Sequence, residues 1–334
     1  MRVRASRAVA PTRIDLAGGT LDIWPICHLV EDAVTVNLAI GLEATAVVTP
    51  RRDDRLVVRS ADRGRRVTLP LPLRGRPRGP LSWLVRLAHA FAPGVPLTLD
   101  VRAEAPAGAG LGGSSALGIA VAAALARAVG TSPSRSDLLR RVQNLETEEI
   151  RVPTGNQDYL AALWGGLSAF WHRPEGVARE ALPHGAALSE RLVLAYTGQP
   201  RQSGFSNWDM FKRFVEGERT TVARMGEIAR LARTMRDALA AGELDDAGRL
   251  LGEEGRLRYR LAPSVATPTL RRIGEAARRA GAVGSKVCGA GGGGCLVAFA
   301  GEGKRDAVAK AIAAAGASVL PVRPARRGVT VSGR

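Results

Sequence analysis

A glycine-rich segment in the first half of the chain limits the folds that this sequence can adopt. The segment reads Pro106-Ala-Gly-Ala-Gly-Leu-Gly-Gly-Ser-Ser115. A β-rich stretch, Leu97–Ala103, predicts a strand before it, and the Ala-rich stretch Ser114–Val129 predicts a buried helix after it. Glycines before a helix let the backbone approach an anion closely, and the first turn of the helix offers unpaired N–H groups. Strand, loop and helix together predict a phosphate-binding site.

Two known phosphate-binding motifs fit this segment poorly. GxxxxGK[ST] requires a Lys after the glycines, and none follows here. Gly108, Gly110 and Gly113 satisfy GxGxxG, but a dinucleotide site also needs an acidic residue at the end of the next strand. The predicted helix is followed by Gly130-Thr-Ser-Pro133 and another helix, so a nicotinamide-dependent dehydrogenase is disfavoured. The remaining alternative is a strand–helix turn with no ligand.

Length and composition indicate two packed domains or one large α/β unit. The chain has 334 residues, of which 46% are hydrophobic and only 4% aromatic, so its core is expected to be aliphatic. The net charge of +17 comes mainly from arginines spread along the chain. No dense basic tract contains aromatic residues, so nucleic-acid binding is not expected. The only lysines are Lys212, Lys286, Lys304 and Lys310.

Cysteine spacing and hydrophobicity favour a cytoplasmic protein. Cys27, Cys288 and Cys295 are odd in number and lack CxxC spacing, which disfavours a disulfide framework or a zinc site. The N-terminus lacks the apolar region of a signal peptide. The apolar stretch Leu117–Val129 is too short to span a bilayer and contains Arg127. We therefore expect a soluble protein of the cytoplasm with no membrane partner.

The remaining pattern mixes strands and helices. Amphipathic helices with breaks near Gly242 and Pro263 are predicted from residue 206 to residue 280, and a second glycine-rich segment, Lys286–Ala300, runs into a strand. A domain boundary is predicted within Pro174–Ala187, which gives domains at residues 1–180 and 181–334. Further strands are predicted at Arg13–Leu16, Ala33–Ile40, Glu43–Thr49, Arg55–Ser60, Leu167–Trp171, Leu192–Thr197 and Ser318–Pro324, and further helices at Ser82–Ala92, Ser132–Glu149 and Lys304–Ala315.

Three motifs resemble, in the same order, those of the GHMP kinases, the family named for galactokinase, homoserine kinase, mevalonate kinase and phosphomevalonate kinase. Pro106–Ala116 resembles the ATP-binding motif, in the form with the extra glycine Gly113. Ala10–Gly19 resembles the N-terminal substrate motif, and Lys286–Cys295 resembles the C-terminal glycine-rich motif. The resemblance implies an α+β fold in which an N-terminal domain like ribosomal protein S5 domain 2 meets a ferredoxin-like C-terminal domain, with the active site between them.

Within the family, the sequence is most similar to the sugar-1-kinase branch typified by D-glycero-D-manno-heptose 7-phosphate kinase. Leu16–Asp22, Gly155–Ala162 with Gly165-Gly166, and Tyr196–Gly204 carry this similarity. One departure is that Thr20-Leu21 stands where the branch has Gly-Thr. The resemblance implies transfer of the ATP γ-phosphoryl group to the anomeric 1-hydroxyl of a sugar or sugar phosphate. The alternatives are a mevalonate-type or other polyol substrate, and a non-catalytic ligand-sensing role.

The resemblance also implies roles for single residues. Asp158 would be the catalytic base, since a carboxylate can accept the proton of a hydroxyl; the alternative is an N-cap of the helix that starts at Tyr159. Arg13 would stabilise the ionised carboxylate and the transferred phosphoryl group; the alternative is a surface arginine. Mg²⁺ would bind Ser115 and Glu146; the alternative for the glutamate is an exposed helix face.

The other implied contacts fall mostly in the same motifs. Asp22, nine residues after Arg13, would accept hydrogen bonds from sugar hydroxyls, and Gly289–Gly294 would close over the phosphates. The implied ligands are ATP, Mg²⁺ and a small-molecule acceptor, and a homodimer is compatible with the sequence. The implied ATP contacts are Pro106, Gly108, Gly110, Leu111, Gly112, Gly113, Ser114, Ser115 and Ala116, and the implied acceptor contacts are Gly18, Gly19, Thr20, Asp22, Arg201, Ser203, Gly291, Gly292 and Gly293.

Overall fold

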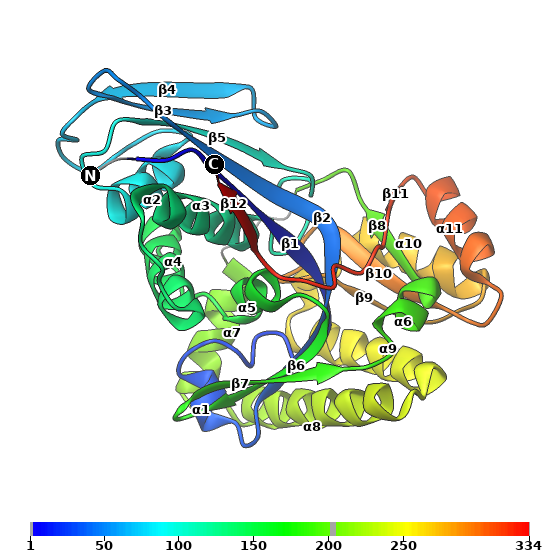
Figure 1. Cartoon of the computed structure of the whole chain (residues 1–334). Helices are drawn as coiled ribbons and strands as arrows, with labels where there is room; N and C mark the ends of the chain where they lie inside the picture. Colours follow the sequence, from blue (N-terminus) through cyan, green and yellow to red (C-terminus); the bar gives the residue numbers. More distant parts are fainter. Residues whose placement is uncertain (1–2, 201–204, 334) are drawn as a thin grey trace.

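Two β-sheets organise the residues that the computed structural model describes, 3–200 and 205–333 (Figure 1). The first sheet has eight strands: β1 (Ser6–Ala17), β2 (Val34–Pro50), β3 (Arg55–Ser60), β4 (Arg65–Pro70), β5 (Leu97–Ala103), β6 (Leu167–Arg173), β7 (Gly176–Leu182) and β12 (Thr330–Gly333). The second sheet has four: β8 (Leu192–Tyr196), β9 (Ala282–Val287), β10 (Cys295–Ala300) and β11 (Ser318–Leu320).

The long strand β2 joins the parts of the first sheet. Its first half pairs with β6, its second half pairs with β5, and β1 pairs along both halves. The strand order is β12-β1-β2-β5-β3-β4, and β6 and β7 extend from β2. Two separate strands were predicted here, but the chain continues through Gly41 as one strand of 17 residues. The register of β1 against β2 shifts next to Pro11, a residue that has no N–H to donate.

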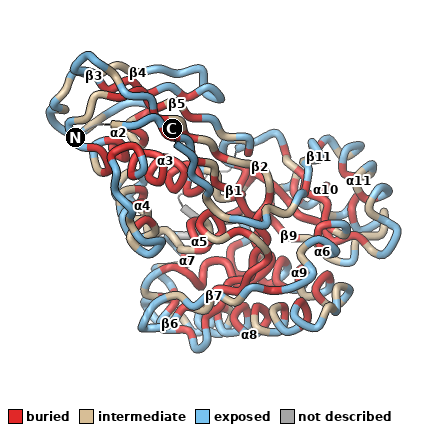
Figure 2. The backbone as a smooth tube through the Cα atoms, viewed as in Figure 1, coloured by how far each residue is buried: buried red, intermediate tan, exposed pale blue. Residues whose placement is uncertain are grey.

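Four helices pack beside the first sheet: α2 (Ser82–Phe91), α3 (Gly113–Val129), α4 (Arg135–Ile150) and α5 (Gln157–Trp164). The helix α3 contacts β1 and β2 and is buried along nearly its whole length (Figure 2). Its side chains are mostly alanine and other apolar residues on nearly every face, as the sequence predicted. The next helix begins at an N-cap, because the Ser134 hydroxyl accepts the Asp137 N–H at 3.1 Å.

The second sheet confirms the predicted ferredoxin-like unit. Its antiparallel order, β11-β8-β10-β9, arises from a chain path in which helices connect β8 to β9 and α11 connects β10 to β11. The helices of this half include α7 (Phe205–Val215), α8 (Arg219–Ala241), α9 (Leu244–Leu261), α10 (Pro268–Arg279) and α11 (Arg305–Ala314), and a 3₁₀ turn lies at Pro263–Val265. Two short helices, α1 (Ile26–Leu29) and α6 (Gly185–Arg191), complete the described part of the chain.

The helix α9 packs unusually close to β9. A Cβ atom at Gly255 would lie 2.6 Å from the Ser285 carbonyl oxygen, and one at Gly284 would lie 2.0 Å from the Gly248 carbonyl oxygen. Only glycine fits at such distances. The close packing brings Glu254 and Arg258 of α9 near Lys286 at the buried end of β9.

The end of the chain returns to the first sheet. The strand β12 pairs with β1, the Val329 N–H donates to the Ala162 carbonyl at 2.7 Å, and the Ala325 N–H donates to the Ala39 carbonyl at 2.9 Å. The predicted division between residues 180 and 181 falls inside β7. The strand β12, which belongs to residues 181–334, pairs with the first sheet. The strand β12 was not predicted, because its four residues are exposed and show no apolar alternation. It forms by backbone pairing with β1.

Two other strand predictions need correction. The predicted strand at Ser318–Pro324 ends at Leu320, because Pro321 and Pro324 cannot donate to a ladder. The strand β4 was not predicted, because it is a short edge strand with only two apolar residues, Val67 and Leu69, which pack partly buried against the core. Among the helices of the described residues, none is both long enough and apolar enough to cross a membrane.

Candidate functional site

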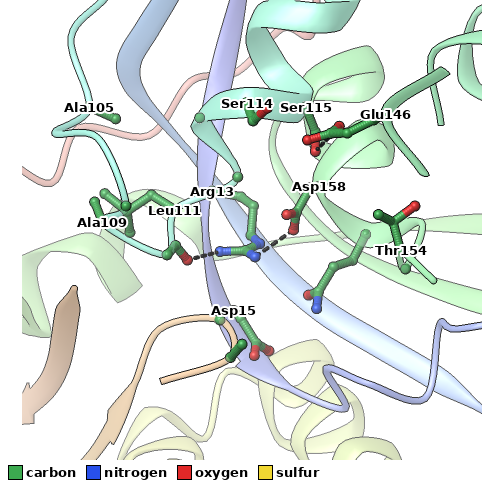
Figure 3. A pocket seen from close by; sticks show the side chains of 18 of the residues that line it. Arg13, Asp15, Ala105, Ala109, Leu111, Ser114, Ser115, Glu146, Thr154 and Asp158 are labelled. Carbon is green, nitrogen blue, oxygen red and sulfur yellow. Dashed lines mark hydrogen bonds and ion pairs between the residues drawn. The ribbon is translucent and has the colours of Figure 1, made fainter. Parts of the chain in front are cut away.

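A cavity of about 250 Å³ lies where the glycine-rich loop, the loop after β1 and the start of α5 meet (Figure 3). Arg258, Gly289 and Ala290 bring the C-terminal half of the chain to its wall. Three segments far apart in the sequence therefore share one cavity, as the resemblance implied.

The glycine-rich loop forms one wall of the cavity. Gly108, Gly110 and Gly112 have φ values of +70°, +78° and +73°, a region that favours glycine. A Cβ atom at Gly110 would lie 2.4 Å from the Cys288 carbonyl oxygen, so this glycine also allows the C-terminal motif to approach. Of the implied ATP contacts, all line the cavity except Ala116, whose side chain turns into the hydrophobic core beneath α3.

Arg13 forms a buried ion pair at the centre of the cavity. Its Nη2 lies 2.5 Å from Asp158 Oδ1, and its Nη1 donates to the Gly110 carbonyl at 2.7 Å (Figure 3). Only 2% of the arginine side chain is exposed, so the surface alternative is excluded. Burial alone would lower the pKa of Arg13, but the charges of Asp158 and Asp15 raise it above its ordinary value. The guanidinium is therefore a permanent positive charge beside the carboxylate.

Asp158 lies between that arginine and the glycine-rich loop. The N-cap position of α5 is Asn156, so Asp158 belongs to the first turn and is not the N-cap. A Cβ atom at Gly112 would lie 3.1 Å from the Asp158 Cγ, which shows how closely the carboxylate approaches the loop. The side chain is partly exposed to the cavity, and it is available to a bound molecule.

A buried carboxylate on α4, that of Glu146, faces the start of α3. Glu146 accepts hydrogen bonds from the Ser115 hydroxyl at 3.1 Å and from the Tyr159 hydroxyl at 2.6 Å. Burial raises the pKa of Glu146, and the hydrogen bonds from Tyr159, Ser114 and Ser115 oppose that rise. The glutamate is thus not on an exposed helix face.

Ser115 and Glu146 fit a magnesium ion that accompanies a nucleotide. Both offer hard oxygen atoms, and the Glu146 carboxylate forms no ion pair within residues 3–200 and 205–333. No group of three or more His, Cys, Asp or Glu side chains in the described chain is placed to hold a metal by itself. An ion here would therefore need phosphate oxygens and water as further ligands, which is how Mg²⁺ commonly binds in nucleotide sites.

The loop after β1 forms the opposite wall. Gly19, Thr20 and Asp22 line the cavity, whereas Gly18 packs against β2, where a Cβ atom would lie 2.1 Å from the Val34 carbonyl oxygen. The buried Asp22 carboxylate accepts the Gln157 N–H at 2.9 Å. Burial raises the pKa of Asp22 to about 6, and the charges of Asp158 and Asp15 add to the rise.

The C-terminal glycines lie differently from the implied contacts. Gly289 and Ala290 line the cavity, but Gly291, Gly292 and Gly293 do not. A Cβ atom at Gly291 would lie 2.4 Å from Val265 Cγ1, and the Gly292 N–H donates to the Val265 carbonyl at 2.9 Å. These glycines serve a tight turn against the 3₁₀ segment. Of the implied acceptor contacts, Arg201 and Ser203 lie outside the described residues.

Sequence reasoning missed a buried network of four charged residues: Asp15, Glu254, Arg258 and Lys286. Lys286 Nζ lies 2.9 Å from Glu254 Oε2 and 3.2 Å from Asp15 Oδ2, and Arg258 Nε donates to Glu254 Oε1 at 2.7 Å. The charges balance as two carboxylates and two cations. One signal was available, because Lys286 is a lysine in a chain that almost always uses arginine. Its partners could not be predicted, since they lie on β1 and α9.

The network lowers the pKa of a carboxylate on β1. Burial alone would raise the pKa of Asp15, but Lys286, Arg258 and Arg13 lower it below its ordinary value. Asp15 therefore stays ionised two residues from Arg13, on the same strand.

Comparison with known protein families identifies the family of this chain. Residues 82–166 match the GHMP kinases N terminal domain, and residues 235–318 match the GHMP kinases C terminal domain. The chain therefore belongs to the GHMP kinase family, whose members are ATP-dependent kinases with hydroxyl acceptors.

Individual relatives differ in their acceptors. The mevalonate kinase of Pyrococcus horikoshii is 28% identical over 211 residues, which cover 62% of this chain and 60% of that enzyme. The crystal structure of a D-glycero-D-manno-heptose 1-phosphate kinase from Bacteroides thetaiotaomicron has a TM-score of 0.78, with 21% identity and 98% of both chains covered. The galactokinase of Lactococcus lactis, complexed with galactose, has a TM-score of 0.77, with 19% identity and coverage of 98% of this chain and 95% of that chain. At these identities, the structural similarity establishes the fold.

Proposed function

We propose that this chain is an ATP-dependent kinase that transfers the γ-phosphoryl group to a hydroxyl of a sugar or sugar phosphate. The first candidate is the anomeric 1-hydroxyl of a heptose 7-phosphate-like substrate. The observation that carries the proposal is the buried Arg13–Asp158 pair, which lies against Gly112 of the phosphate-binding loop and opposite the loop after β1.

The geometry supports a direct transfer. Asp158 accepts the proton of the acceptor hydroxyl while the hydroxyl oxygen attacks the γ-phosphorus, the bond to the β–γ bridging oxygen breaks, and ADP leaves. Arg13 pairs with the Asp158 carboxylate at 2.5 Å and stabilises the charge on the transferred group. The N–H groups at the start of α3 bind phosphate oxygens.

Magnesium would be held by Ser115 and Glu146 together with the nucleotide. When bound, it neutralises negative charge on the phosphates. The protein supplies two oxygen ligands that are already positioned, since the hydroxyl of Ser115 donates to the Glu146 carboxylate across 3.1 Å.

A mevalonate-type acceptor is the second candidate, favoured by the similarity to the Pyrococcus enzyme. It would place an anionic acid, rather than a polyol, beside Asp22. The buried Asp22 carboxylate favours hydroxyl donors over a second carboxylate, because like charges repel at short distance.

A coupled ADP-release assay tests the proposed function. The acceptors tested are heptose phosphates, hexoses, pentoses, inositols and mevalonate. We expect ADP release that requires both Mg²⁺ and one of these acceptors. Phosphate on the product, located by NMR, would identify the acceptor hydroxyl. A rate of ADP release that no member of the panel increases would contradict the proposal.

The titration of Asp22 predicts a pH-dependent acceptor affinity. Its pKa of about 6 means that the carboxylate protonates as the pH falls through 6 and then accepts hydroxyl hydrogen bonds less well. We expect the acceptor KM to rise by up to about tenfold per pH unit below this value, with the KM for ATP nearly unchanged. Asp22→Asn cannot titrate, so its acceptor KM should be high but independent of pH. A flat wild-type profile would contradict this prediction.

A further inference from the structure

Thr20 has a backbone conformation that a β-branched residue rarely adopts. Its φ is +79°, and within the described residues it is the only β-branched residue in the left-handed region. This region is strained for such a side chain, and strain of this kind persists only where neighbouring contacts impose it. Thr20 also stands at the position where the sugar-1-kinase branch carries glycine.

Arg258 supplies the contacts that hold this conformation. Its Nη1 donates to Thr20 Oγ1 at 3.4 Å, and its Nη2 donates to the Gly19 carbonyl. Glu254 fixes the guanidinium from the other side at 2.7 Å and is itself bound by Lys286. The C-terminal half of the chain therefore clamps the loop after β1.

The loop after β1 is tightly packed around Gly19. A Cβ atom at Gly19 would lie 2.5 Å from Asp15 Oδ2, 2.6 Å from Arg258 Nη2 and 2.9 Å from Gln157 Nε2. Thr20 is thus held at a set position in the wall of the cavity, next to Asp22 and Gln157.

The same wall offers oxygen atoms to hydroxyl donors. The Asp22 carboxylate lines it, and Gln157 Oε1 is buried with no hydrogen-bond partner in the described structure. An unpaired buried oxygen is costly unless a ligand donates to it. A glycine at position 20 would leave open the space that the threonine side chain fills.

We propose that Thr20 and Arg258 form the pair that determines acceptor specificity in the proposed kinase reaction, on which this inference rests. The pair selects a polyol that presents hydroxyl groups to Asp22 and Gln157 and carries no substituent larger than a hydroxyl toward Thr20. Arg258 is a positioning residue in this proposal, because it binds Thr20 and the Gly19 carbonyl on the loop while Glu254 and Asp15 hold its guanidinium from behind.

Thr20→Gly tests the pair without a folding defect, because glycine adopts this φ freely. We expect the variant to accept polyols with larger substituents, and its KM for the wild-type acceptor should rise about tenfold while its KM for ATP is unchanged. Thr20→Ser keeps the hydroxyl that meets Arg258 and should restore the wild-type preference in large part. Arg258→Lys keeps the charge but loses the planar fork, so it should broaden the acceptor profile as Thr20→Gly does.

The same acceptor panel, measured by calorimetry with a non-hydrolysable ATP analogue, separates this inference from the proposed function. If the wild type releases no ADP but binds polyols, the kinase proposal fails, and broadened binding by Thr20→Gly would still support the pair. If Thr20→Gly matches the wild type in acceptor profile and affinity, the pair is overturned even where turnover is normal. Absence of polyol binding to the wild type and all variants would overturn the pair as well.

Discussion

Asp158→Asn is expected to lower kcat about 10²- to 10⁴-fold, the range typical for loss of a general base. Asparagine has nearly the same shape but cannot accept the proton of the acceptor hydroxyl, and it removes the charge that pairs with Arg13 at 2.5 Å. The substitution changes no residue of the phosphate-binding loop or of α3. Steady-state kinetics should therefore show the loss in kcat, and calorimetry with an ATP analogue should show nucleotide affinity close to that of the wild type.

Asp306→Asn is the matched control, because Asp306 also lies in the first turn of a helix, α11, but is exposed and far from the cavity-lining residues. Its kinetics should equal those of the wild type. Full turnover in Asp158→Asn would exclude a role as base. Equal losses of turnover and nucleotide binding would instead assign Asp158 a role in shaping the loop.

Lys286→Met is expected to destabilise the fold by about 3–5 kcal/mol, the usual cost of removing one partner from a buried ion pair. Lys286 is fully buried between Asp15 and Glu254, so methionine would leave two carboxylates with Arg258 as their shared counter-charge. Chemical unfolding, followed by circular dichroism, should measure the loss. Lys310→Met makes the same change at an exposed position of α11 and should alter the unfolding free energy by less than about 0.5 kcal/mol.

The pH dependence distinguishes lost charge from lost packing. The pKa of Asp15 is lowered in the native protein, so its ionisation stabilises the fold above the ordinary carboxyl pKa, and this stabilisation is lost as the pH falls through the native value. Without Lys286, the Asp15 carboxylate protonates more readily in acid, and the cost of its burial falls. The difference between wild type and Lys286→Met should therefore shrink as the pH falls. A difference that is independent of pH would identify a packing defect alone.

Much of the fold follows from local patterns. The apolar helix α3 and the breaks at Gly242 and Pro263 were predictable, because periodicity, glycine caps and proline act within a few residues. The ferredoxin-like order of the second half was implied by the family resemblance, and its strand β9 showed no local pattern that predicted it. The strands β4 and β12 were not predictable in this way. They are short edge strands, and they form because another strand offers backbone partners.

The candidate site, too, was predictable from the sequence only in part. The sequence by itself determined the glycine-rich loop, and its resemblance to the GHMP kinases predicted roles for Arg13, Asp158 and Glu146, which all line the cavity. Only the tertiary structure decided that Arg258 reaches the loop after β1 and that Lys286 reaches Asp15 on β1, because those contacts join residues more than two hundred positions apart. It also decided that Thr20 is held in a strained conformation. Burial and close packing between distant segments create these charge and shape constraints, and no local pattern encodes them.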